Sequence, residues 1–237
     1  MKDLHSHYLY GVDDGSKSLE SSMAMLKYAH ENGITDIMVT PHYILDSMYN
    51  STKDNNLVKF KELKEYAKNE FDINLYLGNE VYFCEEILDL IKKGIVSTLN
   101  NSKYILIEIP MYSKLNNVIR IFGDLIKSGY KPILAHPERY TYYYKKMDSF
   151  KELHDMGVMF QINLTSIIGG YGHNAKVMAK KLLKANLIDF IGSDIHKDND
   201  YKFENMEKAL LIIKKYVGEN EYYKIIEGNF NSVLNND

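Results

Sequence analysis

Short apolar segments of strand length alternate along this chain with amphipathic segments of helical length. The predicted strands cover residues 3–7, 35–40, 73–77, 104–107, 132–135, 158–162 and 187–191. The predicted helices cover residues 19–32, 55–69, 85–93, 117–128, 149–156, 174–185, 203–216 and 221–227. Such alternation is typical of parallel strands joined by crossover helices, in either a closed barrel or an open sheet.

Side chains that can bind a metal ion stand where six of these predicted strands end. They are His5 and His7, His42, Glu80, Glu108, His136, and Asp194 with His196. Strands at opposite edges of an open sheet are too far apart to share one centre, whereas barrel strands converge on a mouth where barrel enzymes keep their active sites. We therefore expect an α/β fold, a distorted (β/α)7 TIM-like barrel, as a single domain over residues 1–237.

The first strand brings two imidazoles together. In an extended strand, residues two apart point to the same side, so His5 and His7 face one point. Asp14, in the glycine- and aspartate-rich loop that follows, adds a carboxylate. The complete set of candidate ligands is His5, His7, Asp14, His42, Glu80, Glu108, His136, Asp194 and His196. One ion takes about four to six ligands, so this set suits two or three ions that share a carboxylate. Nitrogen and oxygen donors without a thiolate favour manganese, iron or zinc.

The composition excludes several other classes of protein. The formal charge of -3 provides no basic field for nucleic acid. No apolar run reaches the roughly 20 residues of a membrane-spanning helix. A single cysteine and an N-terminus without an apolar leader lead us to expect a cytoplasmic protein that is not inserted in a membrane.

Closely spaced metal ions in an open mouth suit the hydrolysis of a phosphate ester by a metal-activated hydroxide. Arg139 follows His136 by three residues, and its planar fork can hold phosphate oxygens at two points. A cysteine nucleophile is disfavoured, because Glu85 and Glu86 after Cys84 would raise the pKa of its thiol and repel phosphate.

Seven motifs, in this order, resemble those of the PHP (polymerase and histidinol phosphatase) superfamily. They also resemble, more narrowly, those of its bacterial capsule and exopolysaccharide tyrosine phosphatases. The motifs are Asp3-Leu4-His5-Ser6-His7, Gly11-Val12-Asp13-Asp14-Gly15, Thr40-Pro41-His42, Gly78-Asn79-Glu80, Glu108-Ile109-Pro110, His136-Pro137-Glu138-Arg139-Tyr140 and Gly192-Ser193-Asp194-Ile195-His196. Each motif alone is weak, but together they span nearly the whole chain and are highly specific.

The resemblance implies a protein-tyrosine phosphatase with three divalent metal ions, usually manganese. It implies one metal on His5, His7, Glu80 and Asp194, a second on Glu80, Glu108 and His136, and a third on Asp14, His42 and His196. It also implies a partner, a membrane-associated bacterial tyrosine kinase whose C-terminal tail carries a tyrosine cluster.

For the remaining steps, we expect Arg139 to bind the phosphate and stabilise the transition state with the metals. We expect Asp14 or His42 to relay a proton, and Tyr140 to stack on the substrate ring. The family usually has a second arginine shortly after the last Asp-x-His motif, which is absent here. Lys202, or alternatively Lys197, would supply that charge as a point cation.

Three other functions compete with this interpretation. One is hydrolysis of a small metabolite phosphate such as histidinol phosphate. Another is a metal-dependent amidohydrolase, which is disfavoured because Glu80 and Glu108 stand where that class commonly has a bridging lysine. The third is a non-catalytic module that binds phosphotyrosine tails.

Overall fold

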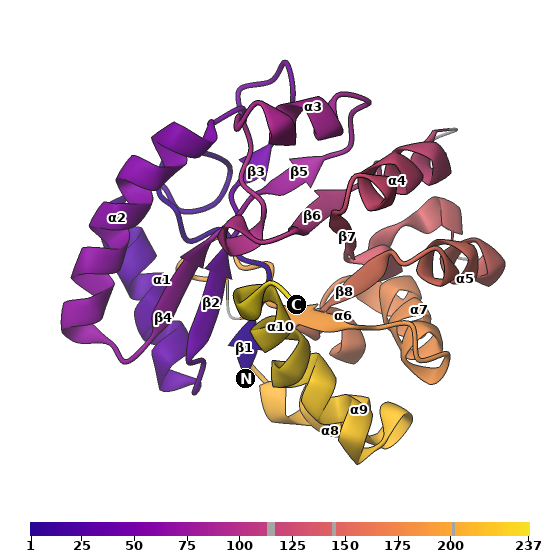
Figure 1. Ribbon diagram of the computed structural model, residues 1–237. Coiled ribbons are helices and arrows are strands. Elements are labelled where there is room, and N and C mark those ends of the chain that lie inside the picture. The colour runs from indigo at the N-terminus through magenta and orange to yellow at the C-terminus, as the bar shows by residue number, and fades with distance from the viewer. Residues whose placement is uncertain (113–116, 144–145, 201) are drawn as a thin grey trace.

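A computed structural model describes residues 1–112, 117–143, 146–200 and 202–237, with strands at the centre and helices around them (Figure 1). The strands are β1 (Lys2–Asp3), β2 (Asp36–Val39), β3 (His42–Tyr43), β4 (Asn74–Leu77), β5 (Glu80–Tyr82), β6 (Tyr104–Glu108), β7 (Lys131–Ala135), β8 (Met159–Asn163) and β9 (Phe190–Gly192). The helices are α1 (Leu19–Glu31), α2 (Lys53–Glu70), α3 (Ile87–Lys92), α4 (Val118–Lys127), α5 (Met147–Asp155), α6 (Leu164–Ile168), α7 (Gly172–Lys184), α8 (Met206–Val217), α9 (Glu219–Tyr223) and α10 (Asn229–Asn235). Short 3-10 turns cover Leu99–Asn101, Pro137–Arg139 and Thr141–Tyr143, and a π-helical turn covers Lys224–Gly228.

The strands form a closed, parallel barrel. Hydrogen bonds join them in the orders β1-β2-β4 and β3-β5-β6-β7-β8-β9. β3 continues the line of β2 and β5 that of β4, so the two orders make one sheet with seven strand positions. Its ends meet where Leu4 N donates to Ile191 O at 3.2 Å and Asp194 N donates to His5 O at 2.9 Å. The predicted seven-stranded barrel is therefore confirmed.

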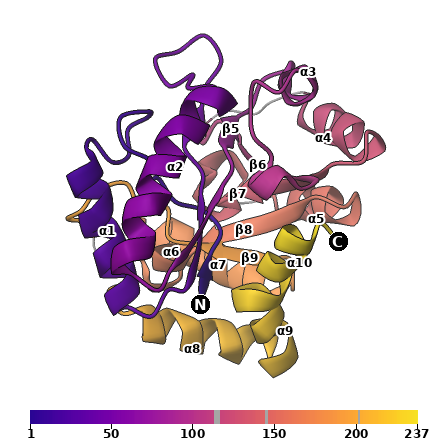
Figure 2. The ribbon, with the colours of Figure 1, turned by 60° about the vertical axis from the view of Figure 1, so that its left-hand side comes forward.

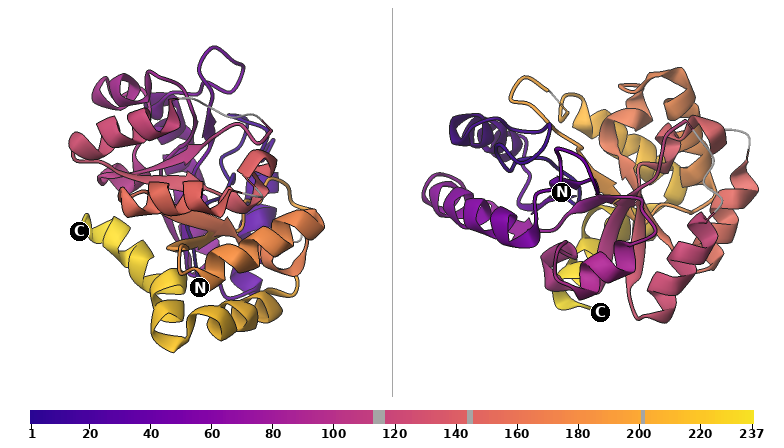
Figure 3. Two further views of the ribbon diagram at one scale, coloured as in Figure 1. Left: turned by 90° about the vertical axis from the view of Figure 1, so that its right-hand side faces the viewer. Right: turned by 90° about the horizontal axis from the view of Figure 1, so that it is seen from above.

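Alternation along the strands builds two cores. Met38, Leu106 and Ile133 belong to a small cluster inside the barrel. Their neighbours Ile37 and Ile105 belong to the larger cluster between the strands and the helices. This period of two matches the geometry of a strand with both faces buried. The helices lie around the strands in Figure 1 and flank them on both sides when the molecule is seen from above (Figure 3).

Helix α10 closes the amino-terminal end of the barrel (Figures 1 and 2). Its Phe230 and Val233 complete the inner cluster. The backbone of Lys103 donates to Asn236 Oδ1 at 2.8 Å, and Lys131 Nζ donates to the carbonyl of Asp237 at 2.6 Å. These contacts leave the opposite, carboxyl-terminal end of the barrel for the site.

Several elements differ from the sequence-based expectations. The strand predicted over residues 3–7 is regular only at Lys2–Asp3, and the strands predicted at 35–40 and 73–77 each continue as a second short strand. Pro41 lacks an N–H group and interrupts the first of these ladders. Helices α6 and α10 were not predicted. Among the described residues, no helix combines the length and the apolar character needed to cross a bilayer.

Gly192 lies where the barrel closes, and a larger residue there is expected to destabilise the fold. A Cβ at this position would lie 2.6 Å from His5 Cβ and 2.8 Å from Gln161 Nε2. We expect Gly192→Ala to lower the free energy of unfolding by about 1–3 kcal/mol, measured by urea denaturation. The control Gly123→Ala, in α4, meets only Met156 Cε at 3.7 Å and should be neutral or stabilising. Equal stability of Gly192→Ala and the parent protein would contradict the tight closure.

Candidate metal centre and active site

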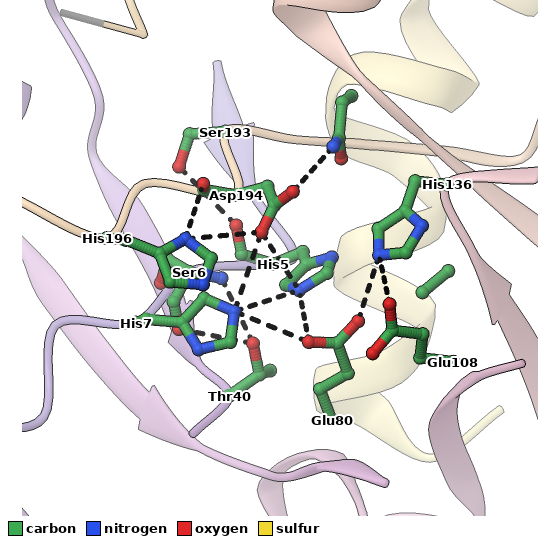
Figure 4. Close-up of polar contacts among 12 residues, drawn as sticks. His5, Ser6, His7, Thr40, Glu80, Glu108, His136, Ser193, Asp194 and His196 are labelled. Atoms are coloured by element: carbon green, nitrogen blue, oxygen red, sulfur yellow. Dashed lines mark hydrogen bonds and ion pairs between the residues drawn. The ribbon is translucent and has the colours of Figure 1, made fainter. Parts of the chain in front are cut away.

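The structure brings all nine candidate ligands to the carboxyl-terminal mouth of the barrel, although six different strand positions deliver them. Figure 4 shows His5, His7, Glu80, Glu108, His136, Asp194 and His196 of this set. Seven of the nine form three overlapping groups, and within each group the donor atoms lie within 4.8 Å of one another. The other two, His136 and Asp194, contact members of these groups. The groups are His5, His7 and Glu80; His7, Asp14, His42 and His196; and His42, Glu80 and Glu108. That these residues ligate metals remains a prediction, which the convergence supports.

Glu80 lies at the centre of the cluster and is fully buried. Its Oε2 is 3.0 Å from His5 Nε2, 3.4 Å from His7 Nε2 and 3.1 Å from His42 Nδ1. Its Oε1 is 3.1 Å from His136 Nε2. The two oxygens thus face imidazoles on two sides, as a bridging carboxylate would.

The other donors complete the two flanks of Glu80. Asp14 Oδ1 is 3.6 Å from both His42 Nε2 and His196 Nε2. On the far side, Glu108 Oε1 is 3.8 Å from His136 Nε2. The resemblance placed His42 only with Asp14 and His196, whereas the geometry also sets it beside Glu80 and Glu108.

Outer contacts orient three of the histidine rings. His7 Nδ1 donates to Asp13 Oδ2 at 2.8 Å, His5 Nδ1 lies 2.9 Å from Gln161 Oε1, and His196 Nδ1 lies 3.0 Å from the carbonyl of Asp194. A proton on each Nδ1 leaves the Nε2 lone pair facing the centre, which is the usual arrangement around metal-binding histidines.

Two buried amide side chains connect His5 to Asp194 by hydrogen bonds. Gln161 Nε2 donates to Asn163 Oδ1 at 3.0 Å, and Asn163 Nδ2 donates to Asp194 Oδ2 at 2.7 Å. Asp194 Oδ1 is left facing His5 and His7 at 3.7 and 3.6 Å. The sequence analysis missed Asp13, Gln161 and Asn163. The available signal was two polar residues, spaced by two, in the otherwise apolar strand β8.

Two of the candidate ligands have a strained backbone conformation. His136 and Asp194 have φ angles of +32° and +54°, in the left-handed region that residues with a Cβ rarely occupy. Both follow the end of a strand, where the chain turns sharply at the mouth. Such strain is typical of residues whose side chains a surrounding site holds in place.

The charges in the cluster shift the pKa values in opposite directions. Burial alone would raise the pKa of Glu80, but the imidazoles of His5 and His42 hold it well below its usual range. Burial, together with the carboxylates of Glu80 and Asp194, raises the pKa of Glu108 to about 8. Burial and the positive charge of Arg139 lower the pKa of His136 to about 4. Despite the opposing effect of burial, the carboxylates of Glu80 and Asp194 raise the pKa of His5 to about 9. The buried carboxylates thus create an environment that favours positive charge at the centre.

The residues present fit divalent metal ions. Asp14 Oδ1, His42 Nδ1 and Glu80 Oε2 are buried and have no hydrogen-bond partner among the described residues. His5 Nε2 and His7 Nε2 lie 3.2 Å apart, close to the roughly 3.3 Å expected of two nitrogens on one tetrahedral ion. Because all donors are nitrogen or oxygen, the set suits manganese, iron or zinc.

A cavity of about 250 Å³ opens onto the cluster. Its lining includes Arg139 and most of the candidate ligands, together with Ile44, Tyr49 and Met111, which the sequence analysis did not identify. Arg139 Nη1 donates to Asp194 Oδ2 at 2.7 Å. The predicted catalytic residues Asp14 and His42 also line this cavity.

Tyr171 holds Arg139 from the other side. The guanidinium carbon lies 4.3 Å from the centre of the Tyr171 ring, and the Tyr171 hydroxyl donates to Asp194 Oδ2 at 3.1 Å. Lys202 Nζ donates to the same hydroxyl at 2.9 Å and pairs with Asp200 at 3.2 Å. Lys202 is thus tied to Arg139 through Tyr171. Its contact with phosphate remains a prediction.

The expectation that Tyr140 stacks on substrate is wrong. Its side chain is fully buried. Its hydroxyl donates to the carbonyl of Ala135 at 2.7 Å and accepts from Ile109 N at 3.1 Å. The 3-10 turn after His136 directs Tyr140 into the core, where its hydroxyl connects the ends of β6 and β7.

The surroundings of Cys84 do not activate its thiol as a nucleophile. It is half-buried, and burial raises the pKa of its thiol to about 11. None of the described residues that line the cavity is a cysteine. The thiol is therefore protonated at neutral pH and lies away from the cluster.

Comparison with known proteins identifies the family. The family model described as "Capsular polysaccharide synthesis, CpsB/CapC" matches residues 1–235. This chain belongs to the CpsB/CapC family. The CapC protein of Staphylococcus aureus is 35% identical over 227 residues, which cover 94% of this chain and 88% of the relative.

Solved structures agree with this CpsB/CapC assignment. One match comes from the crystal structures of YwqE from Bacillus subtilis and CpsB from Streptococcus pneumoniae, described as metal-dependent tyrosine phosphatases. It has a TM-score of 0.93 at 29% identity and covers 100% of this chain and 95% of the other. The histidinol phosphate phosphatase of Lactococcus lactis, at 13% identity and a TM-score of 0.57, covers 91% of this chain and 93% of its own and shares the fold.

Removing the central carboxylate is expected to abolish metal binding at the CpsB/CapC site. Glu80→Gln keeps the side-chain size but removes the negative charge that two groups of donors share. After loading with Mn²⁺ and removal of excess metal, we expect the variant to retain less metal than the parent protein by elemental analysis. We also expect it to lose the rise in melting temperature that Mn²⁺ gives the parent. The exposed Glu70→Gln in α2 is the matched control and should behave like the parent. Equal metal content in Glu80→Gln and the parent would contradict the central role of Glu80.

Proposed function

We infer that this CpsB/CapC protein is a metal-dependent tyrosine-protein phosphatase linked to capsule synthesis. The observation that carries the inference is the cavity in which a cluster of nitrogen and oxygen donors meets one arginine, Arg139. The relatives YwqE and CpsB, described as metal-dependent tyrosine phosphatases, support it.

Phosphate recognition is assigned to Arg139. One nitrogen of its guanidinium is fixed on Asp194, and the Tyr171 ring packs against its face. Arg139 lines the cavity, and the described residues accept no hydrogen bond from its other guanidinium N–H groups, which we propose donate to non-bridging phosphate oxygens. Because its position is fixed before substrate binds, little reorganisation is needed as charge develops on the phosphoryl group.

When bound, divalent metal ions supply Lewis acidity at the phosphoryl oxygens and activate the attacking water. The chain's own residues hold the donors in place through Asp13, Gln161 and Asn163. We propose His5, His7, Asp14, His42, Glu80, Glu108, His136, Asp194 and His196 as the ligands, and manganese as the metal.

The leaving group of phosphotyrosine is a phenolate, whose pKa near 10 makes it a fair leaving group. Ile44, Tyr49 and Met111 also line the cavity, where they can contact its ring. The Asp14 side chain is 47% exposed, and His42 Nε2 lies 3.6 Å from its Oδ1. We propose that these two residues pass a proton between the cavity and solvent.

We propose that the physiological substrate is a phosphotyrosine in the tail of a bacterial tyrosine kinase that controls capsule synthesis. The family description supports the link to capsule synthesis. Hydrolysis of histidinol phosphate and phosphotyrosine binding without catalysis are the competing functions.

The metal mechanism predicts which residues phosphatase activity needs. We expect the parent protein to hydrolyse a phosphotyrosine peptide, to lose this activity with a chelator, and to prefer the peptide over histidinol phosphate in kcat/KM. His136→Ala should lower kcat/KM about 100-fold or more, since lost metal coordination removes several kcal/mol of charge stabilisation. Cys84→Ser should stay within about twofold of the parent, because the thiol takes no part.

The opposite pattern, an inactive Cys84→Ser and an active His136→Ala, would exclude the metal mechanism. A preference for histidinol phosphate would support the metabolite phosphatase instead. Tight peptide binding without turnover would support the binding module.

Substitution of Arg139 tests its fork geometry. We expect Arg139→Lys to lower kcat/KM about 10- to 100-fold, because lysine keeps the charge but cannot donate at two points. The matched control is Arg120→Lys, on the exposed surface of α4, where Arg120 pairs with Glu85. Metal content is measured in both variants, because Arg139 also contacts Asp194. Full activity of Arg139→Lys with normal metal content would remove Arg139 from the mechanism.

A further inference from the structure

A second hollow lies beside the catalytic cavity and shares its loops. This groove, of about 470 Å³, is lined by Val12, Met48, Asn50, Asn55, Val58 and Lys59, among others. The loop between β3 and α2 contributes to both, with Ile44 and Tyr49 in the cavity and Met48 in the groove. Val12 stands two residues before Asp14. The groove therefore lies next to the cavity, because the same two loops line both hollows.

The groove exposes an unusual amount of apolar surface. Met48 is 83% exposed and Val58 is 71% exposed, two of the three most exposed large hydrophobic side chains in the described part of the chain. Single exposed apolar residues are common, but neighbouring ones that line one hollow are typical of a binding surface.

The groove carries little charge, and its one charged side chain is held by backbone carbonyls. The single charged residue among those that line it is Lys59, whose Nζ donates to the carbonyls of Tyr10 and Gly11 at 3.1 and 3.0 Å. By contrast, the hollow on the other side of the mouth is lined by Lys17, Lys197 and Asp200 together with cluster residues. An apolar group is therefore favoured on the Met48 side of the mouth and disfavoured on the other.

The loop that carries Met48 is held in shape by its own hydrogen bonds. Ile44 N donates to Tyr49 O at 2.7 Å, and Ser47 Oγ donates to Ile44 O at 2.9 Å while accepting from Tyr49 N at 3.0 Å. A preformed surface spends less binding free energy on ordering. Asn50 and Asn55 are exposed at the same groove and can bond to a peptide backbone.

We propose that this groove binds an apolar side chain of the peptide segment that flanks the phosphotyrosine. The proposal rests on the proposed function and deepens it, because it assigns to Met48 and Val58 the selection among phosphotyrosine peptides. The occupant is an extended, uncharged stretch of substrate with a residue such as leucine within a few positions of the phosphotyrosine.

The test compares phosphotyrosine peptides in which leucine or glutamine is placed in turn at each flanking position. For the parent protein, we expect one position at which leucine raises kcat/KM about tenfold over glutamine, as burial of an apolar side chain implies. In the double variant Met48→Gln/Val58→Gln, that preference should fall below about twofold. Hydrolysis of p-nitrophenyl phosphate, which does not reach the groove, should stay unchanged. The variant alters no charge, so it leaves the attraction of phosphate to the cavity intact.

The control is Leu211→Gln, at a 68% exposed apolar side chain on α8, which should leave both the peptide preference and p-nitrophenyl phosphate turnover unchanged. Binding of the same peptides as non-hydrolysable phosphonates, followed by fluorescence anisotropy, should show the same preference without catalysis. Equal rates and affinities for all peptides, or a leucine preference that survives in the double variant, would overturn the proposal. If neither peptides nor p-nitrophenyl phosphate are hydrolysed, the proposed function fails, and the anisotropy measurement still decides the groove.

Discussion

The buried carboxylate of Glu80 is the contact on which the site depends. Its two oxygens lie within 3.4 Å of four imidazole nitrogens, with no exposure to water. An ionised carboxylate in such a place costs several kcal/mol of desolvation unless positive charge is close by. Protonated histidines or bound cations both provide that charge. The barrel must therefore close around a centre that is electrostatically complete only with cations inside it.

Asp194 links that centre to substrate recognition, because its two oxygens face different partners. Oδ1 faces the histidines, and Oδ2 accepts hydrogen bonds from Arg139, Asn163 and Tyr171. One carboxylate thus fixes the distance between the donor cluster and the guanidinium. This shared contact explains why the sequence places an arginine and an aspartate from different strands at one edge of the barrel.

The sequence predicted the barrel and the nine clustered residues because ionisable side chains at strand ends leave a periodic signal. Asp13, Gln161 and Asn163 escaped prediction because an amide or a second aspartate in a turn has common structural explanations, and only the folded contacts give it a role. The position of Tyr140 was wrongly predicted because the length of the 3-10 turn before it decides whether its side chain faces solvent or the core. Two predicted strands are each split in two. Pro41 interrupts the first of them, and the position of such a break in the sheet depends on the neighbouring strand as well as on the segment itself.

The donors of the cluster come from residue 5 at one extreme and residue 196 at the other. A chain that is still being synthesised therefore lacks part of the cluster until residue 196 has emerged. The same contacts that complete the donor set, between the first strand and the ninth, also seal the barrel. Closure of the barrel and completion of the donor set therefore require the same contacts, so a chain that is open at this seam lacks a complete set of candidate metal ligands.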